Sequence, residues 1–107
     1  MKSQEIDNTE APNKLWAYLD ARMQNSVNAS LYSAAERLQA ERLRLRLEFC
    51  FNSKNIFINY RKNFITVKLD RPVVKDRKEL RLLESELQSQ NVTKKLSAQG
   101  ICYNIRP

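Results

Sequence analysis

The chain has 107 residues, 42% of them hydrophobic and 29% charged, which indicates a single globular domain rather than a disordered chain. Its 19 Lys or Arg exceed its 12 Asp or Glu, and the resulting net charge of +7 favours polyanionic partners. The absence of His excludes the usual general base and the commonest metal ligand. A single Gly excludes a Gly-rich phosphate-binding loop, and the two Cys lack metal-binding spacing. We therefore predict a protein that is not an enzyme and that binds no cofactor or metal.

The N-terminal sequence, MKSQEIDNTEAPNK, carries acids and lacks the apolar stretch of a secretory signal. Nowhere does the sequence contain the run of about 18 apolar residues that a membrane helix needs. We expect a cytoplasmic protein with no membrane contact, in which Cys50 and Cys102 are free thiols. Residues 1–11 are acidic and without periodicity, so we expect a disordered segment there, followed by one domain over 12–107.

Two helices are predicted before the middle of the chain. Pro12 suits the first turn of a helix that ends near residue 25. The apolar residues of this helix fall on one face: Leu15, Trp16, Leu19 and Met23. The polar stretch NSVNAS (25–30) should interrupt the helix, and a second helix then begins at Ser30 or at Ser33, where Glu36 completes a capping-box spacing. One kinked helix in place of the two stays open.

A three-stranded antiparallel meander is predicted over residues 43–70, LRLRLEFCFNSKNIFINYRKNFITVKLD. In 43–51, Leu and Phe alternate with mostly charged residues, which is typical of a half-buried strand. Turns at 52–55 and 62–63 would connect the strands. The second turn pairs apolar residues across the hairpin: Ile56 with Leu69, Ile58 with Val67, and Tyr60 with Ile65. Both turns give the same apolar face, so the register is consistent.

The C-terminal third predicts one more helix and one more strand. DRKELRLLESELQSQ (76–90) has Asp76 and Glu79 at capping-box spacing and a leucine stripe, which indicates a helix. VTKKLSAQG (92–100) suggests a short extra turn that ends at Gly100, and ICYNI (101–105) alternates as a strand does. The order ααβββαβ predicts an α+β fold with the helices packed on one face of a small sheet.

The register of the meander also defines its second face, which we expect to point away from the helices. This face would gather four cations and two aromatic rings: Arg44, Arg46, Arg61, Lys68, Phe57 and Phe64. Cations neutralise phosphates and rings stack on bases, so the combination predicts binding of nucleic acid, with single strands preferred. A second cluster, beside the start of the third helix, would contact further phosphates: Lys75, Arg77 and Lys78.

Two other interpretations stay open. Outward Arg and Lys on strands are commonly only solvated, and Phe57 and Phe64 would then be covered by the N-terminal segment or by a second subunit. Alternatively, the N-terminal helices form a protein-interaction or self-assembly surface, as in a homodimer. Trp16 is expected in the core with the apolar face of its helix, and Tyr18, two positions away, would then lie with Tyr32 at such an interface.

Overall fold

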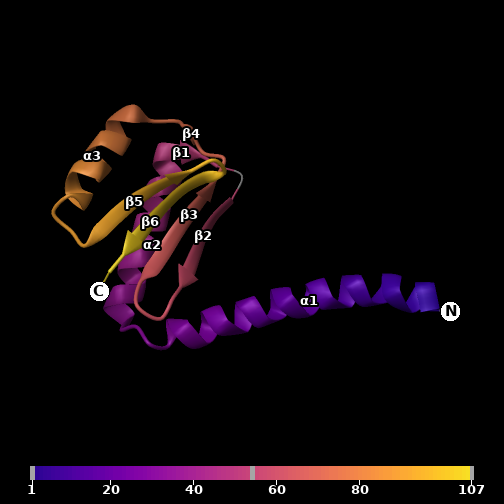
Figure 1. Cartoon of the computed structure of the whole chain (residues 1–107). Helices are drawn as coiled ribbons and strands as arrows, with labels where there is room; N and C mark the ends of the chain where they lie inside the picture. Colours follow the sequence, from indigo (N-terminus) through magenta and orange to yellow (C-terminus); the bar gives the residue numbers. More distant parts are fainter. Residues whose placement is uncertain (1, 54, 107) are drawn as a thin grey trace.

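The structure, a computed structural model, describes residues 2–53 and 55–106 (Figure 1). Its elements follow in the order α1 (Lys2–Ala29), α2 (Ala34–Cys50), β1 (Phe51–Asn52), β2 (Asn55–Tyr60), β3 (Ile65–Asp70), β4 (Val73–Val74), α3 (Arg77–Leu87), β5 (Val92–Ser97) and β6 (Gly100–Ile105). Strands β2, β3, β6 and β5 form an antiparallel sheet in that order, and β1 pairs with β4 in a small second sheet. The predicted α+β class is confirmed.

Helices α2 and α3 cover one face of the four-stranded sheet. In Figure 1, α2 crosses behind the sheet, and α1 projects away from the rest of the molecule. Leu43 and Leu47 of α2 and Leu83 of α3 are buried in the core. The sheet contributes every second residue of its two central strands to this core: Ile65, Val67 and Leu69 from β3, and Tyr103 and Ile105 from β6. Alternate residues of each strand therefore point to opposite sides, one toward the helices and one away from them.

The hairpin of β2 and β3 has the predicted register. Ile56 pairs with Leu69, Ile58 with Val67, and Tyr60 with Ile65. The C-terminal strand is also where the alternation places it, as β6 beside β3. The turn predicted over 52–55 includes Lys54, which lies outside the described residues.

The first strand of the predicted meander is wrong, because residues 43–50 belong to helix α2. The residues that this helix buries are three or four positions apart, as on one face of a helix: Ala40, Leu43, Leu47 and Cys50. Leu, Arg, Glu and Ala dominate residues 34–50, and no β-branched residue occurs among them, so intrinsic propensity favours a helix over a strand. Ser33 starts α2 with a complete capping box, in which its hydroxyl oxygen accepts from the Glu36 N–H (3.1 Å) and its own N–H donates to the Glu36 carboxylate (2.7 Å).

Helix α1 is longer than predicted and ends at Ala29, so the two N-terminal helices are separate. It begins at Lys2, whereas the sequence predicts disorder up to residue 11 and a helix from Pro12 on. Pro12 thus lies inside α1, where it has no N–H to donate to a carbonyl of the preceding turn. Acids near the N-terminus of the helix favour the extension. The prediction that Trp16 packs in the core is wrong, because its side chain is 63% exposed. Of the two tyrosines expected at an interface, Tyr32 is buried in the core and Tyr18 is exposed.

Strand β5 replaces the short turn predicted over residues 92–100. Its residues from Thr93 to Ser97 are exposed at the edge of the sheet, so it lacks the apolar alternation that identifies a strand. Gly100 is not a helix-capping residue, because it opens β6 opposite Asp70 of β3. There the two backbones approach so closely that a Cβ atom on Gly100 would lie 2.0 Å from the carbonyl oxygen of Leu69.

Gly100→Ala is therefore expected to destabilise the protein. The methyl group meets backbone rather than a flexible side chain, so β3 and β6 must move apart, at a cost of about 1–3 kcal/mol. Urea unfolding followed by circular dichroism measures this loss. The exposed neighbour Gln99→Ala serves as control and should change the free energy of unfolding by less than about 0.5 kcal/mol. Equal stability of the two variants would contradict the close approach of the strands.

Candidate nucleic-acid interface

The sheet face that α2 and α3 leave uncovered, here called the open face, carries a row of side chains across all four strands. The register aligns Phe57 of β2, Lys68 of β3, Cys102 of β6 and Lys95 of β5. Phe57 is 46% exposed and Lys95 is exposed, whereas Lys68 and Cys102 are half-buried between their neighbours. The row thus presents an accessible ring beside two ammonium groups.

A second row crosses one end of the open face and has the same chemistry. Arg61 and Phe64 close the hairpin, with the Arg61 N–H donating to the Phe64 carbonyl at 2.9 Å. The Arg106 guanidinium lies over the Phe64 ring, 5.5 Å from its centre, in a cation–π contact. Four residues along a strand separate this row from the first, a distance of about 13 Å.

Polar residues fill the space between the two rows. The register aligns Asn59, Thr66, Asn104 and Thr93 across the four strands. The Thr66 hydroxyl donates to the Asn104 side-chain oxygen at 2.9 Å, and both residues are buried. This bond joins β3 to β6 at the centre of the open face, between the two rows.

The open face is strongly basic. It carries four cations, Arg61, Lys68, Lys95 and Arg106, whereas its acid is Asp70 at the end away from Arg61. Among the described residues, none of the four cations forms an ion pair. Their charges therefore stay available to an anionic ligand.

The structure brings together four of the nine predicted site residues: Phe57, Arg61, Phe64 and Lys68 all lie on the open face. Arg44 and Arg46 do not join them, because α2 carries both on the opposite side of the sheet. Arg44 pairs with Glu41 at 3.1 Å and with Glu48 at 2.7 Å along its own helix. The prediction that Arg46 and Arg61 lie on the same face of the sheet is thus wrong.

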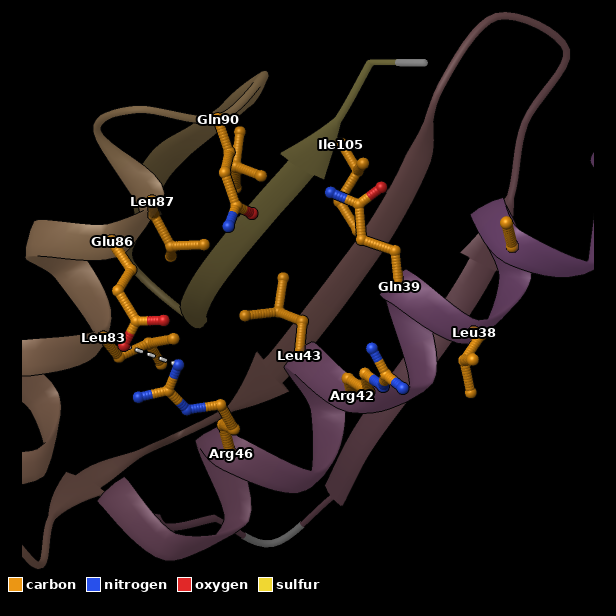
Figure 2. Close-up of a pocket in the computed structure, with 12 residues that line it drawn as sticks. Leu38, Gln39, Arg42, Leu43, Arg46, Leu83, Glu86, Leu87, Gln90 and Ile105 are labelled. Carbon is orange, nitrogen blue, oxygen red and sulfur yellow. Dashed lines mark ion pairs between the residues drawn. The ribbon is translucent and has the colours of Figure 1, made fainter.

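Arg46 instead lines a groove of about 440 Å³ between α2 and α3. Figure 2 shows its guanidinium directed at the Glu86 carboxylate, and the two groups are 2.8 Å apart. Leucines from both helices line the same groove, among them Leu43 and Leu83. This ion pair connects α2 to α3 on the helix side of the sheet, away from the open face.

The second predicted cluster also lies on the helix side. Lys75, Arg77 and Lys78 are exposed around the start of α3, and the Lys75 N–H donates to the Cys50 carbonyl at the end of α2 (2.8 Å). Asp76 caps α3 by accepting from the Glu79 N–H at 3.1 Å. These cations therefore surround a helix junction instead of extending the open face.

Two cations of the open face were missed in the sequence. Lys95 lies on β5, where a turn was predicted, and Arg106 directly follows the last predicted strand. A signal exists for Arg106, which continues the alternation of Cys102 and Asn104. The position of Lys95 follows only from the pairing of β5 with β6.

The titratable groups whose pKa is shifted lie on the helix side. Burial raises the pKa of the Cys50 thiol, and the nearby Glu79 carboxylate raises it further. The thiol therefore stays protonated near neutral pH and is no thiolate nucleophile. Burial likewise raises the pKa values of the Tyr32, Tyr60 and Tyr103 phenols. Within the described part of the chain, no three His, Cys, Asp or Glu side chains gather as a metal site requires.

Comparison with protein-family models, curated protein sequences and solved structures finds no match for this chain. Across residues 2–53 and 55–106, no helix has both the length and the apolar content needed to cross a membrane.

Proposed function

We propose that the protein is a small non-enzymatic binding module whose open face holds single-stranded nucleic acid. The observation that carries the proposal is the row of Phe57, Lys68, Cys102 and Lys95 on the uncovered side of the sheet. An exposed ring beside cations that form no ion pair among the described residues suits a ligand that is both aromatic and anionic. Nucleic acid is the common polymer with both properties.

Each row has a distinct part in this proposal. Phe57 stacks on a base, and Lys68 and Lys95 neutralise phosphates on the same row. At the other end, the Arg106 guanidinium covers the Phe64 ring and offers its own planar surface to a second base, while Arg61 adds a cation. A single strand exposes base faces to such contacts, whereas a duplex hides them between stacked pairs.

Its place of action is proposed to be the cytoplasm. RNA is abundant there, and the reducing conditions keep Cys50 and Cys102 as free thiols. Cys102 lies in the centre of the open face between Lys68 and Lys95, so a reduced thiol leaves this surface unobstructed.

Fluorescence anisotropy with labelled single-stranded RNA, single-stranded DNA and duplex DNA, at several salt concentrations, tests the proposal. We expect the single strands to bind more tightly than the duplex. If all four cations contact phosphates, the logarithm of the affinity should fall against that of salt with a slope of about −3, because each contact contributes about −0.7. Phe57→Ala should remove most of the preference for single strands and leave the slope unchanged. Equal binding to the three polymers, or none, would overturn the proposal.

A further inference from the structure

Helix α1 is fixed to the rest of the molecule by one of its faces. The Asn25 side chain accepts from the Tyr60 N–H at 2.5 Å and donates to the Ile58 carbonyl at 3.5 Å. One turn further on, the Asn28 amide donates to the Tyr60 carbonyl at 2.9 Å. Strand β2 is an edge of the sheet, so these asparagines take the hydrogen bonds that a neighbouring strand would otherwise make. They thereby set which face of α1 points toward the sheet.

The other face of α1 is apolar and exposed. Over residues 15–29, whose side chains the structure describes, it carries five exposed apolar residues: Leu15, Trp16, Leu19, Met23 and Val27, here called the apolar stripe. At 3.6 residues per turn they share an arc of about 120°, on the side of the helix away from Asn25 and Asn28. Trp16 and Met23 are 63% and 66% exposed. An apolar patch of this kind on a soluble helix marks an interaction surface.

The sheet and helices of the same chain do not cover the apolar stripe. The asparagine contacts hold α1 with the stripe turned outward, and the helix projects from the body over much of its length (Figure 1). The long axis of the molecule reaches 60 Å for this reason, against 31 and 18 Å in the other two directions. A surface that covers the stripe would therefore have to come from another molecule.

We propose that the apolar stripe packs against the apolar stripe of a second copy of this chain. Leu15, Leu19, Met23 and Val27 follow one another at four-residue intervals, and such a row forms a ridge that fits between the same rows of another helix. Because the same patch serves both copies, the contact closes a twofold dimer and leaves no open end.

The distribution of charge selects an antiparallel arrangement of the two helices. Residues 30–107 carry 16 Lys or Arg against eight Asp or Glu, a net charge of +8, whereas residues 1–10 carry a net charge of −2. A parallel pair would bring both basic bodies together and both acidic ends together. An antiparallel pair separates the bodies and places each acidic end near the basic body of the other copy. Leu19 of one copy then faces Met23 of the other.

Sedimentation equilibrium of the full chain tests the dimer. We expect a particle of twice the 12.6 kDa chain mass at micromolar concentrations, and Met23→Glu should raise the dissociation constant at least about tenfold by placing a charge in the apolar contact. Ala17→Glu is the matched control, since it adds the same charge at an exposed position of α1 outside the stripe. Trp16→Ala should weaken the dimer without adding charge. Circular dichroism checks that each variant folds.

Disulfide trapping tests the orientation. In a Cys102→Ser background, a mixture of Leu19→Cys and Met23→Cys chains is expected to form mainly the mixed disulfide on mild oxidation. Disulfides mainly between identical variants would overturn the antiparallel arrangement. A monomeric wild-type chain, or equal weakening by Ala17→Glu and Met23→Glu, would overturn the dimer itself. The nucleic-acid proposal does not depend on either result.

Discussion

Replacing Lys68 and Lys95 together by Glu is expected to lower the affinity for single-stranded nucleic acid about a hundredfold or more. The change removes two of the proposed phosphate contacts, both from the row that contains Phe57, and adds two charges that would repel a polyanion. It should also make the salt dependence shallower by about 1.4 in slope, since each lost contact accounts for about 0.7. Anisotropy titrations at three or more salt concentrations measure both quantities.

The matched control is Arg77→Glu with Lys78→Glu. This pair has the same change of net charge but lies in the first turn of α3, on the helix side of the sheet. Acids are favourable near the N-terminus of a helix, so the fold should tolerate the change. We expect this variant to retain most of the affinity. An equal loss in both variants would mean that overall charge attracts the ligand and that the open face has no special part.

A half-buried lysine can also affect folding, and for this reason Lys95→Glu alone is the companion variant. Lys95 is exposed on the edge strand β5, where a charged side chain is normal. If Lys95→Glu keeps the wild-type unfolding temperature and still weakens binding, the loss comes from the open face itself. Unchanged binding in a folded double variant would refute the proposed interface.

The sequence predicts the parts of this fold in which local signals agree. In the β2–β3 hairpin, alternating β-branched and aromatic residues and a short turn specify one register, and that register is the one observed. The start of α3 is likewise marked by Asp76, whose side chain caps the helix. Each of these elements is determined by residues close together in the chain, so one sequence suffices to find it.

Strand β5 is not predictable in the same way. Its pairing with β6 joins Val92 to Ile105 and Lys95 to Cys102, but its own side chains are mostly exposed. An edge strand of this kind is held by backbone hydrogen bonds to a neighbouring strand. The pattern of hydrophobic residues in the sequence does not indicate such bonds. For the same reason, the sequence identifies the open-face residues of the β2–β3 hairpin but does not identify Lys95 on β5.

Segment 43–50 shows how a pattern can fit two structures. Its leucines and Phe49 alternate as a strand does, yet Leu43 and Leu47 also lie one helical turn apart. The capping box of Ser33 and Glu36 and the lack of β-branched residues favour the helix, and these signals decide the outcome. The same choice moves Arg44 and Arg46 to the other side of the sheet, which is why two candidate site residues were misplaced.

Alanine substitutions at Leu47 and Phe49 separate these two structures in solution. In a strand both side chains would face the core and both truncations would be costly. In α2, Leu47 is fully buried and Phe49 is 71% exposed. Leu47→Ala is therefore expected to lower the free energy of unfolding by about 2–5 kcal/mol, because it leaves a cavity between α2 and the sheet. Phe49→Ala should cost less than about 0.5 kcal/mol.

Urea unfolding monitored by circular dichroism measures the free energy of unfolding of both variants, and the difference between the two values distinguishes the helix from the strand. Phe49 has the larger side chain, so a larger loss at Phe49 than at Leu47 would indicate the strand and would return Arg46 to the side of Arg61. The expected order, with Leu47 far more costly, keeps Arg44 and Arg46 away from the open face. The same pair of measurements therefore tests the fold and also limits the binding surface to Phe57, Lys68, Lys95 and their neighbours.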